Sequence, residues 1–186
     1  MLNNSIVRVS LKPTLVVVKT LYIVRHAKSS WDDPSLPDRE RPLNKRGFKN
    51  AHELANCIKI SNYKVDMAYS SPAKRALNTA EIICDKLEIT QDQFKVHDGF
   101  YPLNYRYLFQ FIQNLDNSLE AVLIVGHEPA LSQFVNHFLE TPLEKLVTGS
   151  LTKLDFDVAH WRDVRPSSIL KIHHLNRHYW SGVELK

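Results

Sequence analysis

Glycine is scarce in this chain, with five residues among 186, and no two of them lie close together. A P-loop cradles phosphates with closely spaced glycines, so this class of nucleotide site is excluded. The Gly-x-Ser-x-Gly turn that presents a nucleophilic serine is also missing. Any phosphate chemistry in this protein must therefore rely on side chains rather than on a glycine-rich loop.

Long apolar runs are missing as well. The N-terminal stretch contains one apolar run of four residues, 15–18, whereas a membrane span needs about 20 and a signal peptide about 7–15 followed by a cleavage site of small residues. We therefore expect no membrane partner and a cytoplasmic location. Residues 1–18 are expected to form a poorly ordered N-terminal extension, and residues 19–186 to form the folded domain.

Cysteine is limited to Cys57 and Cys84, both in stretches with helical patterning. A lone disulfide is one interpretation of such a pair. Two free thiols in a reducing compartment are the interpretation that the sequence favours, because a chain of this size can bury a sizeable core without a covalent link.

The remaining composition is that of an ordinary globular domain, with 44% hydrophobic and 24% charged residues. The formal net charge of +4 is spread along the chain rather than gathered in a stripe. This pattern argues only weakly for nucleic acid and better for an anionic substrate, so we expect no nucleic-acid partner.

Apolar periodicity predicts strands that alternate with helices, which is typical of an α/β fold. We predict a single-domain, three-layer α/β/α architecture with a mostly parallel central sheet. Ser71 and Pro72 have the chemistry of a helix start. The expected strands are 20–25, 66–70, 94–100 (or an extended loop there), 121–126, about 150–156 and 168–174, and the expected helices are 44–60, 71–87, 104–115 and 129–139.

Basic and imidazole side chains follow three of these strands. Arg25 and His26 come at the end of the first strand, Arg75 lies in the first helical turn after the second, and His127 follows the apolar run 121–126. Ligands of open α/β sheets bind beyond the carboxyl ends of the strands, so we expect these four side chains to meet. Guanidinium groups bind phosphate oxygens through two parallel hydrogen bonds. The four side chains are therefore predicted to bind a phosphorylated substrate.

A nucleophile is needed if this site is catalytic. A neutral imidazole nitrogen can attack phosphorus and form a covalent phosphohistidine. His26 is the better candidate of the two histidines, because it lies between Arg25 and the end of the first strand. The alternative is structural: Arg25 and His26 could cap the strand and pair with the acidic loop 32–40.

Three stretches together resemble the histidine phosphatase superfamily, whose name-giving motif is Arg-His-Gly: "RHA" at 25–27, "SSPAKRALNTA" at 70–80 and "VGHEP" at 125–129. The longer stretches "LYIVRHAKSSWDDPSLPDRERPLNKRG" and "TGSLTKLDFD" look like its SixA-like phosphohistidine phosphatase branch, and the resemblance covers about residues 20–175. It implies that His26 is the nucleophile, that Arg25 and Arg75 clamp the phosphoryl oxygens, and that His127 donates a hydrogen bond to the phosphoryl group.

The chain departs from the superfamily pattern at two places. Ala27 replaces the usual glycine, a small change. Many members carry a glutamate as general acid in the region that here reads "VHDGFYPLN", near Tyr101 or Pro102, and Asp98 is the nearest carboxylate. Because an imidazole leaves with far less protonation than an alkoxide, a site without a strong acid favours phosphohistidine or activated aryl esters.

We therefore expect a phosphatase that acts on a phosphohistidine-bearing protein, without cofactor or metal. Two alternatives stay open: a phosphomonoesterase for small activated phosphoesters, and a non-catalytic phosphate-binding module, against which the histidine at position 26 argues. Imidazole groups bind zinc, and the sequence contains His173, His174 and His178 close together. Neighbouring residues of a strand point to opposite faces, so no metal is expected there.

Overall fold

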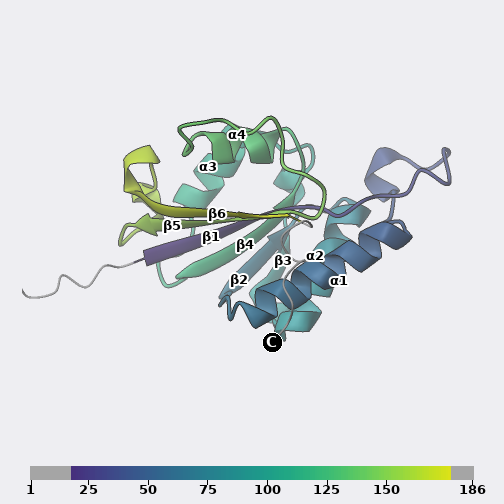
Figure 1. Cartoon of the computed structure of the whole chain (residues 1–186), viewed down its shortest axis with the longest axis horizontal. Coiled ribbons are helices and arrows are strands. Elements are labelled where there is room, and N and C mark those ends of the chain that lie inside the picture. Colours follow the sequence, from purple (N-terminus) through teal and green to yellow (C-terminus); the bar gives the residue numbers. More distant parts are fainter. Residues whose placement is uncertain (1–17, 177–186) are drawn as a thin grey trace, which may run out of the picture.

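The computed structural model describes residues 18–176 as one α/β domain with a six-stranded sheet in the order β3-β2-β4-β1-β5-β6 (Figure 1). The strands are β1 (Val18–Arg25), β2 (Met67–Ser70), β3 (Phe94–Val96), β4 (Ala121–Gly126), β5 (Leu151–Asp157) and β6 (Ile169–Leu175). The helices are α1 (Lys45–Ile60), α2 (Lys74–Leu87), α3 (Tyr105–Gln113) and α4 (Ala130–Asn136). Short 3-10 turns lie at Asp38–Glu40, Gln91–Gln93, Asp98–Phe100, Trp161–Asp163 and Pro166–Ser168.

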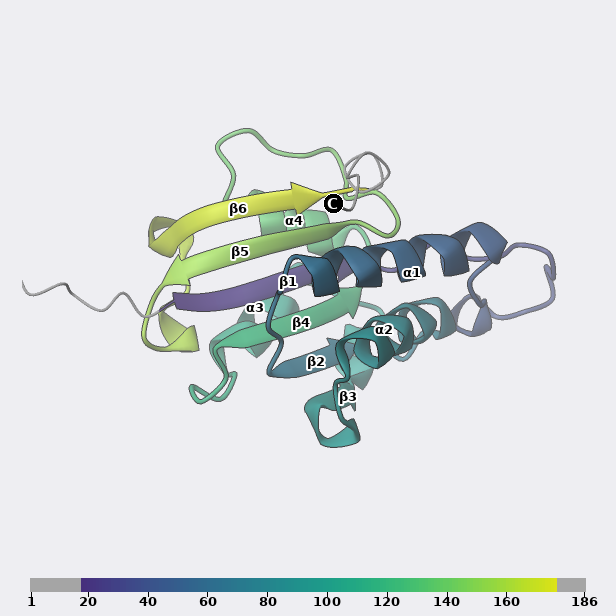
Figure 2. The same cartoon turned by 60° about the horizontal axis from the view of Figure 1, so that its bottom comes forward.

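The helices cover both faces of the sheet, as a three-layer fold requires: α1 and α2 lie on one face and α3 and α4 on the other (Figures 1 and 2). Side chains of β1 alternate between the two cores that result. Leu21 and Ile23 pack into the core on the α3–α4 side, while Tyr22 and Val24 pack into the core on the α1–α2 side. The predicted single-domain α/β architecture is confirmed.

The predicted central strand is also confirmed, because every residue of β4 is buried and β4 pairs in parallel with β1 and with β2. In this register Arg25 lies opposite Gly126, and Ser70 lies opposite Val125. The carboxyl ends of three neighbouring strands are therefore level, and the residues that follow them start from the same edge. The sheet is mixed beyond β1, since β5 runs antiparallel to both of its neighbours, β1 and β6.

Two local predictions are wrong. Helix α2 begins at Lys74 with Ala73 as its N-cap, and no side chain caps it. Ser71 lies before this N-cap, where its hydroxyl accepts the N–H of Ala73 at 3.3 Å and lies 2.7 Å from Nε2 of His127. Helix α3 turns Tyr107 outward, leaving it 40% exposed, although the spacing of Tyr107, Leu108, Phe111, Ile112 and Leu115 in the sequence predicts that these residues all face inward.

Cys57 and Cys84 are free thiols, as predicted. Within residues 18–176, no helix has both the length and the apolar composition of a membrane span. The expected extension, residues 1–18, lies outside the described residues except for Val18, which begins β1.

The first turn of α1 is pressed against the chain that leaves β1, and Gly47 makes this approach possible. A Cβ at Gly47 would lie 2.1 Å from the carbonyl oxygen of Lys28, which also accepts the backbone N–H of the N-cap Asn44 at 3.0 Å. Replacing Gly47 by alanine is expected to lower the free energy of unfolding by about 1–3 kcal/mol, because this overpacking outweighs the gain in helix propensity. Urea unfolding tests this, with Lys49→Ala on the exposed side of the same helix as control. Equal stability of the two variants would contradict the tight approach.

Candidate active site

The edge of the sheet fixes the backbone of Arg25 and His26. The N–H of His26 donates to the carbonyl of Gly126 at 3.2 Å, and the N–H of Arg25 donates to the carbonyl of Ser150 at 3.1 Å. Gly149, with a φ of +73°, donates its N–H to the carbonyls of both residues at 3.1 Å. The two residues are therefore held between β4 and the start of β5, and their positions do not depend on a mobile loop.

The imidazole of His26 is buried, with 8% of the residue exposed, and both ring nitrogens have partners. Nδ1 lies 2.7 Å from the carbonyl oxygen of Ala27. Because that oxygen can only accept, Nδ1 carries the proton. Nε2 then holds a lone pair, which accepts from Nε of Arg75 at 3.3 Å. This tautomer is the one that a nucleophilic Nε2 requires.

Arg75 is buried in the first turn of α2 and is also bound to the loop that follows β1. Its two terminal nitrogens donate to Asp38, one to the carbonyl oxygen at 2.5 Å and one to Oδ2 at 2.8 Å. The same Oδ2 accepts from the hydroxyl of Tyr101 at 2.6 Å, and Oδ1 accepts from Arg41 at 2.9 Å. Arg75 thus contacts both His26 and an anionic carboxylate.

His127 faces His26 across the edge of the sheet, with ring centroids 4.9 Å apart and an interplanar angle of 54°. Its Nε2 lies 2.7 Å from the Ser71 hydroxyl, and its buried Nδ1 has no partner in the described part of the chain. The ring of Tyr101 packs edge-on against it at 5.5 Å. The rings of two residues that are 101 positions apart in the sequence are in this way brought together, as expected for residues that follow the carboxyl ends of strands.

Arg25 completes the group of four predicted residues. Its guanidinium donates to the carbonyl of Leu146, and its buried Nε has no partner among the residues described. Arg25 and Arg75 both act on the pKa values of His26 and His127. The structure therefore brings all four predicted side chains together.

Burial is the main cause of the low pKa values of the two histidines. It lowers the pKa of His26 to about 4, and the positive charges of Arg75 and Arg25 act in the same direction. It lowers the pKa of His127 to about 3, assisted by His26 and Arg75. Both rings are consequently neutral at pH 7, so His26 keeps its lone pair in a cationic environment. Such a site attracts a phosphoryl group and offers it a nucleophile.

Comparison with known sequences relates part of this chain to a family. The profile of the histidine phosphatase superfamily (branch 1) matches residues 21–100, which include Arg25, His26 and Arg75. This part of the chain is therefore similar to the histidine phosphatase superfamily. A chloroplastic protein of Arabidopsis thaliana, itself uncharacterized, is 33% identical over 99 residues, which are 53% of this chain but 41% of that protein.

Solved structures share the fold of this chain. SixA of Agrobacterium tumefaciens has a TM-score of 0.69 at 24% identity, over 74% of this chain and 92% of that chain. A protein histidine phosphatase SixA in complex with tungstate has a TM-score of 0.67 at 21% identity, over 82% and 95% of the two chains. At these identities the likeness concerns the fold, which confirms the SixA-like architecture expected from the motifs.

The two places where the chain departs from the superfamily pattern differ in burial. Ala27 is fully buried, and its N–H donates to Thr79 at 3.0 Å. The side chain of Asp98 is 91% exposed and lies 3.6 Å from Arg39, and no hydrogen bond or ion pair within residues 18–176 joins it to the four site residues. Tyr101, not Asp98, therefore lies beside His127.

Sequence reasoning missed Asp38, Tyr101 and Ser71 as members of the site. Asp38 belongs to the acidic loop 32–40, and the pairing of that loop with arginine is the sequence signal for its place. Tyr101 was considered as the position of a missing acid. Ser71 was read as a helix cap, and the strand end before it was the signal that could have placed its hydroxyl near His127.

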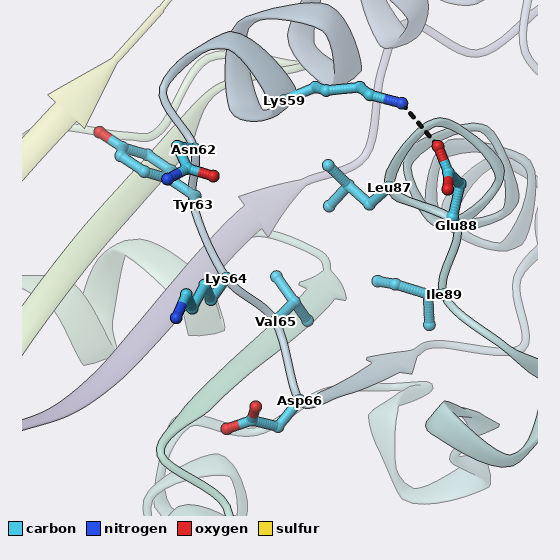
Figure 3. A pocket seen from close by; sticks show the side chains of 9 residues that line it. All are labelled: Lys59, Asn62, Tyr63, Lys64, Val65, Asp66, Leu87, Glu88 and Ile89. Atoms are coloured by element: carbon cyan, nitrogen blue, oxygen red, sulfur yellow. Dashed lines mark hydrogen bonds and ion pairs between the residues drawn. The ribbon is translucent and has the colours of Figure 1, made fainter.

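The cavity shown in Figure 3 is separate from this site. It has a volume of about 400 Å³ and lies where α1 and α2 end and β2 begins, with the ion pair of Lys59 and Glu88 (2.8 Å) at its rim. The cavity therefore lies at the amino end of β2, whereas His26 follows the carboxyl end of β1. None of the four site residues lines the cavity.

Metal ligation was not expected, and within residues 18–176 no group of three or more histidine, cysteine or carboxylate side chains is arranged to hold an ion. On β6, His173 is exposed, while Nδ1 of His174 lies 2.9 Å from the hydroxyl of Thr152. His178 lies outside the described residues.

Acidification from pH 7 to pH 4.5 is expected to lower the free energy of unfolding by a few kcal/mol. The unfolded chain takes up protons on His26 and His127 near the ordinary histidine pKa of about 6.5, whereas the folded protein resists protonation until about pH 4 and pH 3. Stability is therefore lost between pH 6.5 and 4.

Urea unfolding over this range measures the effect, and a His26→Gln/His127→Gln variant should show a clearly smaller pH slope. The low pKa of Asp38, about 2, affects stability only below the ordinary pKa of about 4 for a carboxyl group, so it does not interfere. An unchanged slope in the double variant would show that other groups cause the effect.

Proposed function

We propose that this protein is a phosphatase that transfers a phosphoryl group to Nε2 of His26 and then to water, and that its substrate is phosphohistidine on a cytoplasmic protein. The observation that carries the proposal is the neutral His26, whose proton is held on Nδ1 by Ala27, whose Nε2 accepts from Arg75 and whose ring lies beside that of His127. Histidine, rather than serine, cysteine or a metal-bound water, is the nucleophile that this arrangement supplies.

Two displacement steps account for the reaction. In the first, the Nε2 lone pair leaves its hydrogen bond with Arg75 and forms a bond to phosphorus, while the bond from phosphorus to the leaving group breaks and its electrons depart with that group. Arg25, Arg75 and His127 donate hydrogen bonds to the phosphoryl oxygens, whose charge they stabilise. In the second step a water oxygen attacks phosphorus, the bond to Nε2 breaks, and phosphate leaves with the lone pair restored on His26.

The state of the nearby carboxylates supports phosphohistidine as the substrate. Hydrogen bonds from Tyr101, Arg75 and Arg41 hold the pKa of Asp38 at about 2, so Asp38 is ionised at pH 7 and has no proton to give. Asp98 is exposed and paired with Arg39. A phosphorus–nitrogen bond tolerates the lack of a carboxylic acid, because imidazole is a good leaving group near neutral pH, whereas an alkoxide is not. The similarity to structures named phosphohistidine phosphatase points the same way.

A pair of substrates tests the proposal. The full-length protein is incubated with a phosphohistidine peptide and, separately, with para-nitrophenyl phosphate, and kcat/KM is measured for both at pH 7. Much faster turnover of the peptide is expected. The reverse preference would make the protein a phosphomonoesterase for activated esters, and no turnover of either substrate would make it a phosphate-binding module.

A further inference from the structure

A second cavity adjoins the site at Arg25. It has a volume of about 300 Å³, and basic side chains dominate its lining: Arg25, Lys28, Arg46 and Lys145, with Thr148 beside them. Among the described residues no carboxylate lines it. The mechanism above uses Arg25 and leaves the other three basic groups without a role.

Three separate segments are held together to form this basic cavity. Lys28 is fixed by the hydrogen bond of its carbonyl with Asn44 and by the close approach of Gly47, which together place the first turn of α1, and with it Arg46, beside it. Lys145 comes from the loop before β5, which is tied to the end of β1 by Gly149. The fold thus gathers positive charges that are remote in sequence next to one guanidinium of the proposed phosphate clamp.

These charges are poorly neutralised by the protein itself. Within residues 18–176, Lys145 has one ion pair, with Glu144 at 3.7 Å, and the two side chains are 62% and 89% exposed. No ion pair joins Lys28 or Arg46 to a carboxylate of the described chain. Clustered like charges repel one another, and the repulsion is relieved when an anion binds.

We propose that this basic cavity binds acidic side chains that flank the phosphorylated residue of a protein substrate. The inference rests on the proposed phosphatase function and names the partner's chemistry. A bound phosphoryl group on Arg25 places neighbouring residues of the same polypeptide within reach of Lys28, Arg46 and Lys145.

A polypeptide fits this surface better than a small anion does. The segment that carries Lys28 and Arg46 reaches out beyond the ends of the strands (Figure 2) and also exposes large apolar side chains. Trp31 is 70% exposed and Phe48 is 42% exposed. Exposed apolar side chains on the same segment as basic ones are typical of protein-binding surfaces, while a small dianion would gain nothing from them.

Two stable phosphohistidine-analogue peptides test the proposal. They differ only in whether the residues next to the analogue are Asp and Glu or Asn and Gln, and their Kd values are measured by calorimetry at low salt. The native protein should bind the acidic peptide about tenfold more tightly, since several exposed charge pairs each add a fraction of a kcal/mol. The preference should shrink as salt is added.

A variant that removes three charges, Lys28→Gln/Arg46→Gln/Lys145→Gln, should bind both peptides equally. A matched control, Lys64→Gln/Lys86→Gln/Lys171→Gln, loses the same charge at exposed positions elsewhere and should keep the preference. Equal binding of the two peptides to the native protein, or a preference that survives in the first variant, would overturn the proposal. So would tighter binding of phosphoserine, a small phosphorylated carboxylic acid, than of the acidic peptide.

Failure of the phosphatase proposal would look different. Binding of these analogues does not require turnover, so an acidic preference without hydrolysis of phosphohistidine would refute the proposed reaction and leave the basic cavity in place.

Discussion

His26→Ala is expected to abolish turnover of the phosphohistidine peptide and of para-nitrophenyl phosphate, lowering kcat by at least about ten-thousandfold. The variant lacks the atom that forms the bond to phosphorus, and binding by Arg25, Arg75 and His127 replaces little of that chemistry. The same variant should no longer acquire an acid-labile, alkali-stable phosphoryl label when it is quenched during turnover. The measurement is a single-turnover assay with labelled substrate.

His52→Ala is the matched control for this experiment. His52 is an exposed histidine on α1, and its loss should change neither turnover nor labelling. His127→Ala should slow turnover but still become labelled, because it removes a donor to the phosphoryl oxygens and leaves Nε2 of His26 in place. Labelling of the His26→Ala protein would identify another nucleophile and refute the mechanism.

The position of His26 and His127 at one edge of the sheet could be predicted from the sequence. Apolar runs locate β1 and β4, and parallel strands of an α/β sheet direct their carboxyl ends to the same side. The residues that follow such runs are therefore neighbours, whatever their separation along the chain. Arg75 could be placed by the same logic, since it lies in the first turn of the helix that follows β2.

Asp38 could not be placed in this way. It lies in a proline-rich loop, where the apolar spacing of neither a helix nor a strand indicates which way a side chain points. Its position follows from tertiary contacts, namely the hydrogen bonds from Arg75, Tyr101 and Arg41. The basic cavity was missed for a related reason: Lys145 comes from a long loop, and its approach to Lys28 depends on close backbone contacts at Gly47 and Gly149.

Arg75→Ala is expected to lower kcat/KM for phosphohistidine peptide by roughly 100- to 1,000-fold, because it removes the donors that stabilise the charge developing on the phosphoryl oxygens. Arg75→Lys should recover only part of this loss, since an ammonium group keeps the charge but cannot present two parallel donors. Lys74→Ala, the neighbouring exposed residue in the same helical turn, should leave kcat/KM unchanged. Inhibition by vanadate should weaken in parallel with the loss of activity.

The contacts of Arg75 also allow a purely structural role, and Asp38→Asn separates the two. If Arg75 acted only as an anchor for the loop, removing the charge of Asp38 would damage activity as much as removing Arg75. If Arg75 binds the phosphoryl group, the carboxylate of Asp38 competes with that group for the same guanidinium, and Asp38→Asn should leave KM equal or lower. The competition is physically required, because both ligands are anions and Nη2 of Arg75 already lies 2.8 Å from the carboxylate. A large rise in KM for Asp38→Asn would therefore assign Arg75 to the loop rather than to the reaction.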